Sequence, residues 1–187
     1  MKYESLYPHL DFSTDTGWGY LPPSKEIMDV IDFVATECKP KMLLEIGYYA
    51  GHSTSYLAHR MPDCQIISCC PNHPMFRKTC LDVEKAYSNV KIIGNMSPGI
   101  IDYVCDWIFD FAFIDGSHHK MPVQMDVALC LTLGVEWILF DNADQRGVRE
   151  GIAPYRDRMK KVKSWDYYGE NKGKVSLNTI TLFRVKG

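Results

Sequence analysis

Five short apolar runs recur along the chain, separated by segments whose apolar residues have helical spacing. The first of them, 42–46, does not alternate between apolar and polar residues, so it predicts a strand buried on both faces of a sheet, and the others predict further strands. The predicted strands span 42–46, 64–70, 90–93, 111–114 and 137–140. Because strands and helices alternate, the pattern predicts a mostly parallel, doubly wound sheet covered by helices on both faces.

The helical segments carry start and stop signals. Ser24 is the predicted N-cap of the first helix, and Lys39-Pro40 ends it. A later helix has Met121, Met125 and Leu129 on one face. The last helix is predicted to be long, from five apolar residues at helical spacing: Val148, Ile152, Tyr155, Met159 and Val162. The tail predicts two strands, 164–168 and 176–185, that form an antiparallel hairpin and complete an α/β sheet of seven strands.

The length and charge of the chain indicate how many domains it forms and which kinds of partner it is not expected to bind. The chain has 187 residues, which suits one domain with a substantial core, and we predict an N-terminal arm over 1–23 followed by a domain over 24–187. A formal net charge of −2 argues against a basic nucleic-acid-binding face, and no apolar run reaches membrane-spanning length. We expect no nucleic-acid partner and no membrane partner, and the sequence leaves a homo-oligomer open.

Seven cysteines are scattered along the chain, without a C-x-x-C pair. An odd number without that spacing favours reduced thiols inside a cell, so we expect a cytoplasmic protein. The close group Cys64, Cys69, Cys70 and Cys80 could form a soft-metal site. Free cysteine more often behaves as a small buried hydrophobic residue, and core packing is the preferred interpretation.

A glycine loop follows the first predicted strand. Gly47 and Gly51 lie in it, and Ser53 then opens a helix. A strand, a glycine turn and a helix N-terminus form a site suited to a ligand with negative charge, although two glycines after a strand also occur in ordinary tight turns. The G-x-x-x-G spacing differs from the G-x-G-x-x-G of nicotinamide enzymes, which disfavours a dinucleotide.

The residues of this loop also carry a resemblance. Glu45-Ile46-Gly47, Tyr49, Gly51 and Ser53 resemble motif I of class I S-adenosylmethionine-dependent methyltransferases, most of all the metal-dependent catechol-type and sugar O-methyltransferases. The resemblance covers roughly 24–185 and implies the Rossmann-like methyltransferase fold with S-adenosylmethionine as cofactor. It implies that the loop at Gly47 and Tyr49 passes the methionine part of the cofactor. The Ser53 hydroxyl would help to hold the cofactor carboxylate.

Acidic residues follow the fourth and fifth predicted strands. Asp115 comes after the fourth, and Asp141 and Asn142 come after the fifth, where ligands bind in doubly wound sheets. Two carboxylates and an amide oxygen suit Mg²⁺, Mn²⁺ or Ca²⁺, although Asp and Asn are also common in turns. The three residues match the metal triad of the similar family by position. The resemblance also places Asp115 beside the cofactor, and a cation there would lower the pKa of an acceptor hydroxyl.

His118 lies three residues beyond Asp115, where catechol-type enzymes carry a lysine. Histidine suits removal of a proton near pH 7, and the similar sugar O-methyltransferases use histidine in this region. His118 is therefore the candidate general base, with His119 as the lesser candidate. A surface histidine without a role is the alternative.

Two positions depart from the family pattern. Where most members have an acidic residue that binds the ribose, this chain has Cys70, with Asn72 nearby as a substitute acceptor; near the adenine it has Asn95 instead of aspartate. Loss of a charged hydrogen bond could weaken cofactor binding by about one to two decades. Two hypotheses follow. One is a metal-dependent O-methyltransferase acting on a small hydroxylated acceptor such as a sugar. The other is a non-catalytic binding protein with a methyltransferase-like fold.

Overall fold

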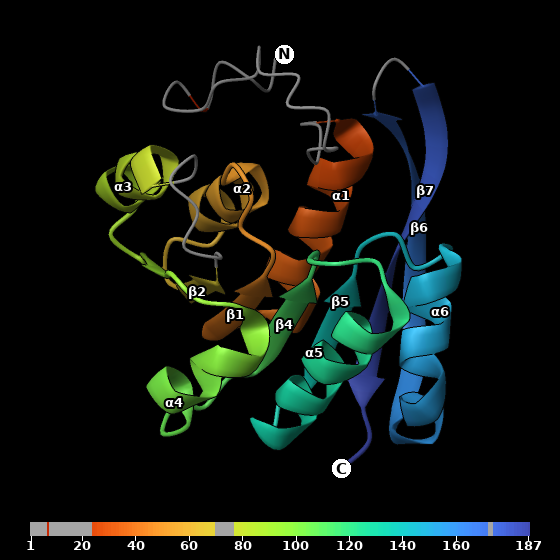
Figure 1. The fold of residues 1–187 in the computed structure, drawn as a ribbon. Helices are drawn as coiled ribbons and strands as arrows, with labels where there is room; N and C mark the ends of the chain where they lie inside the picture. The colour runs from red at the N-terminus through yellow and green to blue at the C-terminus, as the bar shows by residue number, and fades with distance from the viewer. Residues whose placement is uncertain (1–6, 8–23, 70–76, 172–173) are drawn as a thin grey trace.

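The computed structural model describes Tyr7 and residues 24–69, 77–171 and 174–187 (Figure 1). Its centre is a seven-stranded sheet in the order β3-β2-β1-β4-β5-β7-β6. The strands are β1 (Met42–Ile46), β2 (Gln65–Cys69), β3 (Val90–Ile93), β4 (Phe111–Ile114), β5 (Trp137–Phe140), β6 (Met159–Asn171) and β7 (Lys174–Val185). The first five pair in parallel, and β7 pairs antiparallel with β5 and β6. The predicted mostly parallel sheet with a C-terminal hairpin is confirmed.

Helices cover both faces of this sheet (Figure 1). On one face lie α1 (Lys25–Phe33) with its π-helical continuation η2 (Val34–Cys38), α2 (His52–Arg60) and α3 (Arg77–Ala86). On the other face lie η3 (Ser97–Ile100), α4 (Ile101–Val104), α5 (Lys120–Thr132), α6 (Arg146–Ile152) and η4 (Ala153–Arg158). The Ser24 N-cap is confirmed, because its hydroxyl accepts a hydrogen bond from the Ile27 amide at 3.3 Å.

The two faces of the sheet form separate hydrophobic cores. Along β1, Leu43 packs into the core under α1 and α2, whereas Leu44 and Ile46 pack into the core under α4 and α5. Successive side chains of a strand point to opposite faces, so a strand that lies between two helical layers must be apolar at nearly every position. This requirement explains why the parallel strands are mainly apolar; Glu45 in β1 and Ser68 in β2 are buried polar exceptions that hydrogen-bond to each other. Tyr7 joins the first core, with its ring 4.8 Å from that of Tyr56.

The predicted long helix over 148–162 is wrong. Helix α6 ends at Ile152, a 3₁₀ turn follows, and β6 begins at Met159. Pro154 lies in the first turn of the 3₁₀ helix, where its missing amide hydrogen is tolerated; inside an α-helix it would break a hydrogen bond and clash with the preceding turn. Lys160, Lys161 and Lys163 therefore lie on a strand and not on a helix.

Strand β6 is an edge of the sheet, since β7 is its one partner among the strands that the structure describes. Lys160, Lys161 and Lys163 lie on it and are exposed. Charged side chains on an edge strand oppose pairing with a strand of another molecule, because such pairing would bring their charges together and desolvate them. Among the helices that the structure describes, none is both long and apolar enough to cross a membrane.

Candidate functional site

The glycine loop after β1 touches the loop after β4. Gly47 has φ +112°, and a Cβ placed on it would lie 2.1 Å from the carbonyl oxygen of Asp115. A side chain at this position is therefore excluded by both backbone conformation and space. Gly47 thus sets the candidate cofactor loop directly against the residue that begins the acidic centre.

Gly51 and Tyr49 give the rest of this loop its shape. Gly51 is the N-cap of α2 with φ +80°, and a Cβ there would lie 2.6 Å from the Tyr48 hydroxyl oxygen. Tyr49 also has a positive φ, of 45°, which is uncommon for a residue with a side chain. The turn leads directly into the N-terminus of α2. The first backbone amide groups of this helix can donate hydrogen bonds to a negatively charged group.

Glu45 lies inside the protein beneath this loop, with none of its surface exposed. Its carboxylate accepts hydrogen bonds from Ser53 at 2.6 Å, from Ser68 at 2.5 Å and from Thr54. Burial raises the pKa of Glu45, and these three hydroxyl donors oppose that rise. Through these hydrogen bonds Glu45 connects β1 with β2 and with the first turn of α2. The Ser53 hydroxyl is directed to Glu45, so the two residues form one unit at the helix N-terminus.

Removing the Glu45 carboxylate is expected to destabilise the protein. Glu45→Ala would leave three buried hydroxyl groups without their acceptor, at a cost of about 3 kcal/mol or more in the free energy of unfolding. Urea denaturation of the variant measures this change. Glu37→Ala, which removes an exposed glutamate, is the control and should stay within about 0.5 kcal/mol of the parent. An equal effect of both substitutions would contradict the anchoring role of Glu45.

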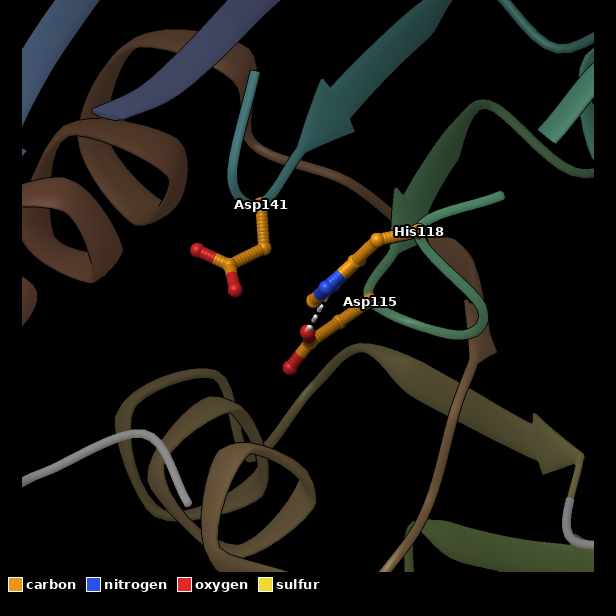
Figure 2. Close-up of side chains that lie close together, drawn as sticks. All are labelled: Asp115, His118 and Asp141. Carbon is orange, nitrogen blue, oxygen red and sulfur yellow. Dashed lines mark ion pairs between the residues drawn. The ribbon is translucent and has the colours of Figure 1, made fainter. Parts of the chain in front are cut away.

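The acidic residues predicted at the strand ends converge. Ile114 and Phe140 are partners in the β4–β5 ladder, so Asp115 and Asp141, which follow them, lie side by side. His118 reaches back over Asp115, with its Nε2 atom 3.9 Å from Asp115 Oδ1 (Figure 2). One ligand atom from each of these three residues lies within 4.8 Å of the others. The three side chains form what we call the acidic centre.

Burial and neighbouring charges shift the pKa values of all three side chains of the acidic centre. Burial, followed by the negative charge of Asp141, raises the pKa of Asp115 well above its ordinary value. Burial also raises the pKa of Asp141. Two adjacent carboxylates with raised pKa values gain from any positive charge placed between them, whether a proton or a cation. Burial lowers the pKa of His118, which favours the neutral imidazole that can accept a proton.

Asp141 and Asn142 have further partners. The Tyr167 hydroxyl donates to Asp141 Oδ1 at 2.8 Å, and the Asn142 amide nitrogen donates to Asp141 Oδ2. The Asn142 amide oxygen accepts a hydrogen bond from Gln145 at 2.7 Å. Asn142 therefore lies next to Asp141 as the sequence predicts, but its oxygen is directed to Gln145. The imidazole of His118 lies close to the carboxylates of Asp115 and Asp141.

The acidic centre fits a divalent cation. Its donors are two carboxylates and an imidazole nitrogen, a set that suits Mg²⁺ or Mn²⁺ and, through the imidazole, Mn²⁺ in particular. His118 Nε2 is a buried atom with no hydrogen-bond partner among the residues that the structure describes. The side chain of Asp115 is 19% exposed, so the centre is accessible from solvent.

The loop that carries His118 is packed closely. A Cβ placed on Gly147, at the start of α6, would lie 2.1 Å from the His118 carbonyl oxygen. His119 is the N-cap of α5, and it is exposed. The role of Gly147 could not be predicted from the sequence, because nothing in the local pattern of α6 indicates that another loop approaches it. His118 is thus held at the acidic centre, whereas His119 lies at the surface.

The loop after β3 contains Asn95, whose side chain is used locally. Its amide nitrogen donates to the Gly99 carbonyl at 3.2 Å, and its oxygen accepts from the Met96 amide at 2.8 Å. Ser97 in the same loop donates to Asp126, a residue that sequence analysis missed. Cys70 and Asn72, the predicted ribose contacts, lie outside the described residues.

Asp126 is buried on the inner face of α5, among Val123, Val127 and Cys130. Burial raises its pKa to about 6, and the hydrogen bond from Ser97 opposes the rise. Because the pKa in the folded state exceeds the ordinary value of the unfolded chain, this group destabilises the fold as pH rises from about 4 to about 6, and the penalty remains above pH 6. In the sequence, Asp126 stands out as a single acidic residue among the apolar residues of this helix, which could have indicated a buried carboxyl group.

Neutralising Asp126 is expected to stabilise the protein at neutral pH. Asp126→Asn keeps an oxygen for Ser97 and removes the buried charge, so the free energy of unfolding should rise by about 2 kcal/mol at pH 7.5. The gain should shrink toward zero near pH 4. Melting curves across this pH range measure it, with the exposed Asp102→Asn as the control. A gain independent of pH would show that the charge of Asp126 is not its cause.

Comparisons with known proteins agree with the fold and with the glycine loop. A family model described as a methyltransferase domain matches residues 44–142. This segment contains the glycine loop and all three residues of the acidic centre. No curated protein matches the chain significantly.

Solved structures of methyltransferases have a similar fold. The O-methyltransferase TomG of tomaymycin synthesis from Streptomyces achromogenes, solved with S-adenosylmethionine, has a TM-score of 0.70 and 19% identity, with 88% of this chain and 81% of that chain covered. An O-methyltransferase from Bacillus cereus, solved with S-adenosylhomocysteine, has a TM-score of 0.69 and 18% identity over 87% and 82%. The methyltransferase PaMTH1 of Podospora anserina, also bound to S-adenosylhomocysteine, has a TM-score of 0.61 and 20% identity over 86% and 78%.

The family model covers more than half of the chain, and the sheet order and the glycine loop after β1 agree with it. The chain therefore belongs to the methyltransferase domain family, and its fold is that of the solved O-methyltransferases.

Proposed function

We propose that the protein transfers the methyl group of S-adenosylmethionine to a hydroxyl group of a small acceptor such as a sugar, with a divalent cation at the acidic centre. The observation that carries this proposal is the convergence of Asp115, Asp141 and His118 at the ends of β4 and β5. This centre adjoins the glycine loop through the contact between Gly47 and Asp115. Cofactor and acceptor would therefore meet between two loops that touch.

The reaction requires a nucleophilic oxygen in line with the methyl group. The acceptor oxygen forms a bond to the methyl carbon as the carbon–sulfur bond breaks, and sulfur keeps the electron pair of that bond as S-adenosylhomocysteine leaves. The chemistry supplied by a cation held by Asp115 and Asp141 is a lower pKa of the coordinated acceptor hydroxyl. The chain then has to accept the hydroxyl proton and hold the two reactants in line.

His118 is the proposed proton acceptor. Burial lowers its pKa, so the imidazole is neutral near pH 7 and able to take a proton. Its Nε2 atom is directed to the side of the acidic centre on which Asp115 lies (Figure 2). The close contact of Gly147 with the His118 carbonyl restricts movement of this loop. The same imidazole could instead serve as a third ligand, but proton transfer is the role we propose.

The cofactor would lie along the glycine loop. Gly47, Tyr49 and Gly51 would let its methionine part approach the backbone, and Ser53 at the first turn of α2 would face its carboxylate. Glu45 would act indirectly by holding the Ser53 hydroxyl. Asn95 would approach the adenine, and Cys70 and Asn72 the ribose. The net charge of −2 favours a small acceptor over a nucleic acid, and a cytoplasmic location suits the reduced cysteines.

A non-catalytic binding protein is the second candidate. The observation in its favour is that Asn95 stands where an acidic residue is expected and uses both ends of its amide within its own loop. Isothermal titration with S-adenosylmethionine, with and without Mg²⁺ or Mn²⁺, tests the two candidates. Binding of the cofactor together with methylation of a hydroxylated acceptor that depends on the cation supports the enzyme. A stably folded protein that binds neither cofactor nor cation would contradict the proposal.

A further inference from the structure

The C-terminal hairpin holds the loop that carries Asp141. The Ala143 amide donates to the Thr179 carbonyl at 2.7 Å, and the Thr179 amide donates to Asp144 Oδ1 at 2.9 Å. Tyr167 adds the hydrogen bond to Asp141. Strand β7 of the hairpin lies beside β5 in the sheet (Figure 1), so the loop after β5 is fixed by residues that are distant in sequence.

Tyr167 is the member of this set that touches the acidic centre. Its side chain is 4% exposed and belongs to the core under α1, whereas the next residue, Tyr168, is 69% exposed. This difference follows from the alternation of side chains along β6. The phenol ring is therefore packed within the protein, and its hydroxyl has a fixed position from which it donates to Asp141 Oδ1 at 2.8 Å.

The Asp141 carboxylate has a hydrogen-bond donor at each oxygen. Tyr167 donates to Oδ1 and the Asn142 amide donates to Oδ2. A carboxylate with two donors of fixed position loses its freedom to rotate about the bond to Cβ. Its remaining lone pairs then have a set direction, and binding a cation between Asp141 and the nearby Asp115 requires less reordering of the ligand.

We propose that Tyr167 is a positioning residue for the acidic centre, whose hydroxyl orients the Asp141 carboxylate for a divalent cation shared with Asp115. This inference rests on the proposed function in one respect, that a cation binds at this centre. Groups that hydrogen-bond to a metal-ligating carboxylate commonly change metal affinity by 10- to 100-fold when they are removed. Tyr167 would act through Asp141 and would touch neither reactant.

Titration with Mn²⁺ tests the inference without reference to an acceptor. Calorimetry or electron paramagnetic resonance would give the dissociation constant for the parent protein, Tyr167→Phe and Tyr168→Phe. Tyr167→Phe keeps the buried ring and removes only the hydroxyl, and we expect it to bind Mn²⁺ about 10-fold more weakly. Tyr168→Phe removes an exposed hydroxyl on the same strand and should bind as the parent does.

Activity gives a second readout. If Tyr167 acts through the cation, Tyr167→Phe should need about 10-fold more Mn²⁺ for half-maximal turnover and should approach parent turnover at saturating Mn²⁺. A Tyr167→Phe variant with a lower melting temperature but an unchanged Mn²⁺ dissociation constant would overturn the inference and leave the proposed function intact. A parent protein that binds neither Mn²⁺ nor Mg²⁺ would overturn the proposed cation site and the inference together.

Discussion

Asp141→Asn is expected to weaken binding of Mg²⁺ or Mn²⁺ by more than about 100-fold, because it removes one of the two carboxylates of the acidic centre. Methyl transfer that depends on the cation should be lost to a similar extent. The amide still accepts a hydrogen bond from Tyr167, and asparagine has nearly the same volume, so the fold should remain. Calorimetric titration with Mn²⁺ and circular dichroism on the same sample measure binding and folding separately.

Asp144→Asn is the matched control for this experiment. Asp144 lies three residues further along the same loop, is exposed, and accepts its hydrogen bond from the Thr179 amide. It is not part of the acidic centre, so its neutralisation should leave cation affinity within about two-fold of the parent value. Equal losses in the two variants would mean that the negative charge of the region, rather than ligation by Asp141, attracts the cation.

His118→Ala is expected to lower turnover by about 10²–10⁴-fold, the usual contribution of a positioned general base. Affinity for S-adenosylmethionine should change little, because the glycine loop is untouched. The matched control is His119→Ala, which removes an exposed imidazole adjacent in sequence. Single-turnover kinetics with each variant, together with cofactor titration, would measure the two effects.

The pH dependence distinguishes a proton acceptor from a structural histidine. Burial lowers the pKa of His118, so its neutral, active form should persist to lower pH than for an ordinary histidine, and parent turnover should fall only below its lowered pKa. In His118→Ala this fall at acidic pH should disappear. Parent-like turnover in His118→Ala would remove His118 from the mechanism, and the proton would then have to pass directly to solvent.

The parallel strands could be predicted because burial leaves short segments that are mainly apolar. The predicted and observed bounds of β1, β3, β4 and β5 are the same. The error at the end of α6 has a physical reason. Met159 and Val162 continue the helical spacing by coincidence, while Pro154 ends the helix and an edge strand follows, in which charged residues are as many as apolar ones. Periodicity alone does not separate these two cases.

The face of α5 was also hard to infer from sequence. Met121 and Met125 are 62% and 46% exposed, whereas Leu129 on the same predicted face is buried, as is Asp126. Nearly the whole circumference of this helix is apolar, so the pattern does not tell which side faces the sheet. The actual orientation is set by tertiary contacts, such as the hydrogen bond from Ser97 to Asp126.

The acidic centre was partly accessible from sequence. Asp115 and Asp141 follow neighbouring parallel strands, and that position alone predicts their convergence. The partners that orient them were not accessible. The Gln145 side chain donates a hydrogen bond to the amide oxygen of Asn142 within a local turn. Tyr167 lies on β6, and no local sequence pattern specifies the register of that strand in the sheet, so its hydrogen bond to Asp141 could not be predicted. Residues that support a site from distant segments become visible only in three dimensions.

The position of β7 between β5 and β6 has a consequence for the order in which the protein is built. During synthesis the five parallel strands and both carboxylates of the acidic centre emerge before Tyr167 and Thr179 do. Pairing of β5 with β7 therefore has to wait until the hairpin has been made. Asp141 therefore acquires its final hydrogen bonds only after the last strand has inserted, so a nascent chain carries the acidic residues before it can hold them in place.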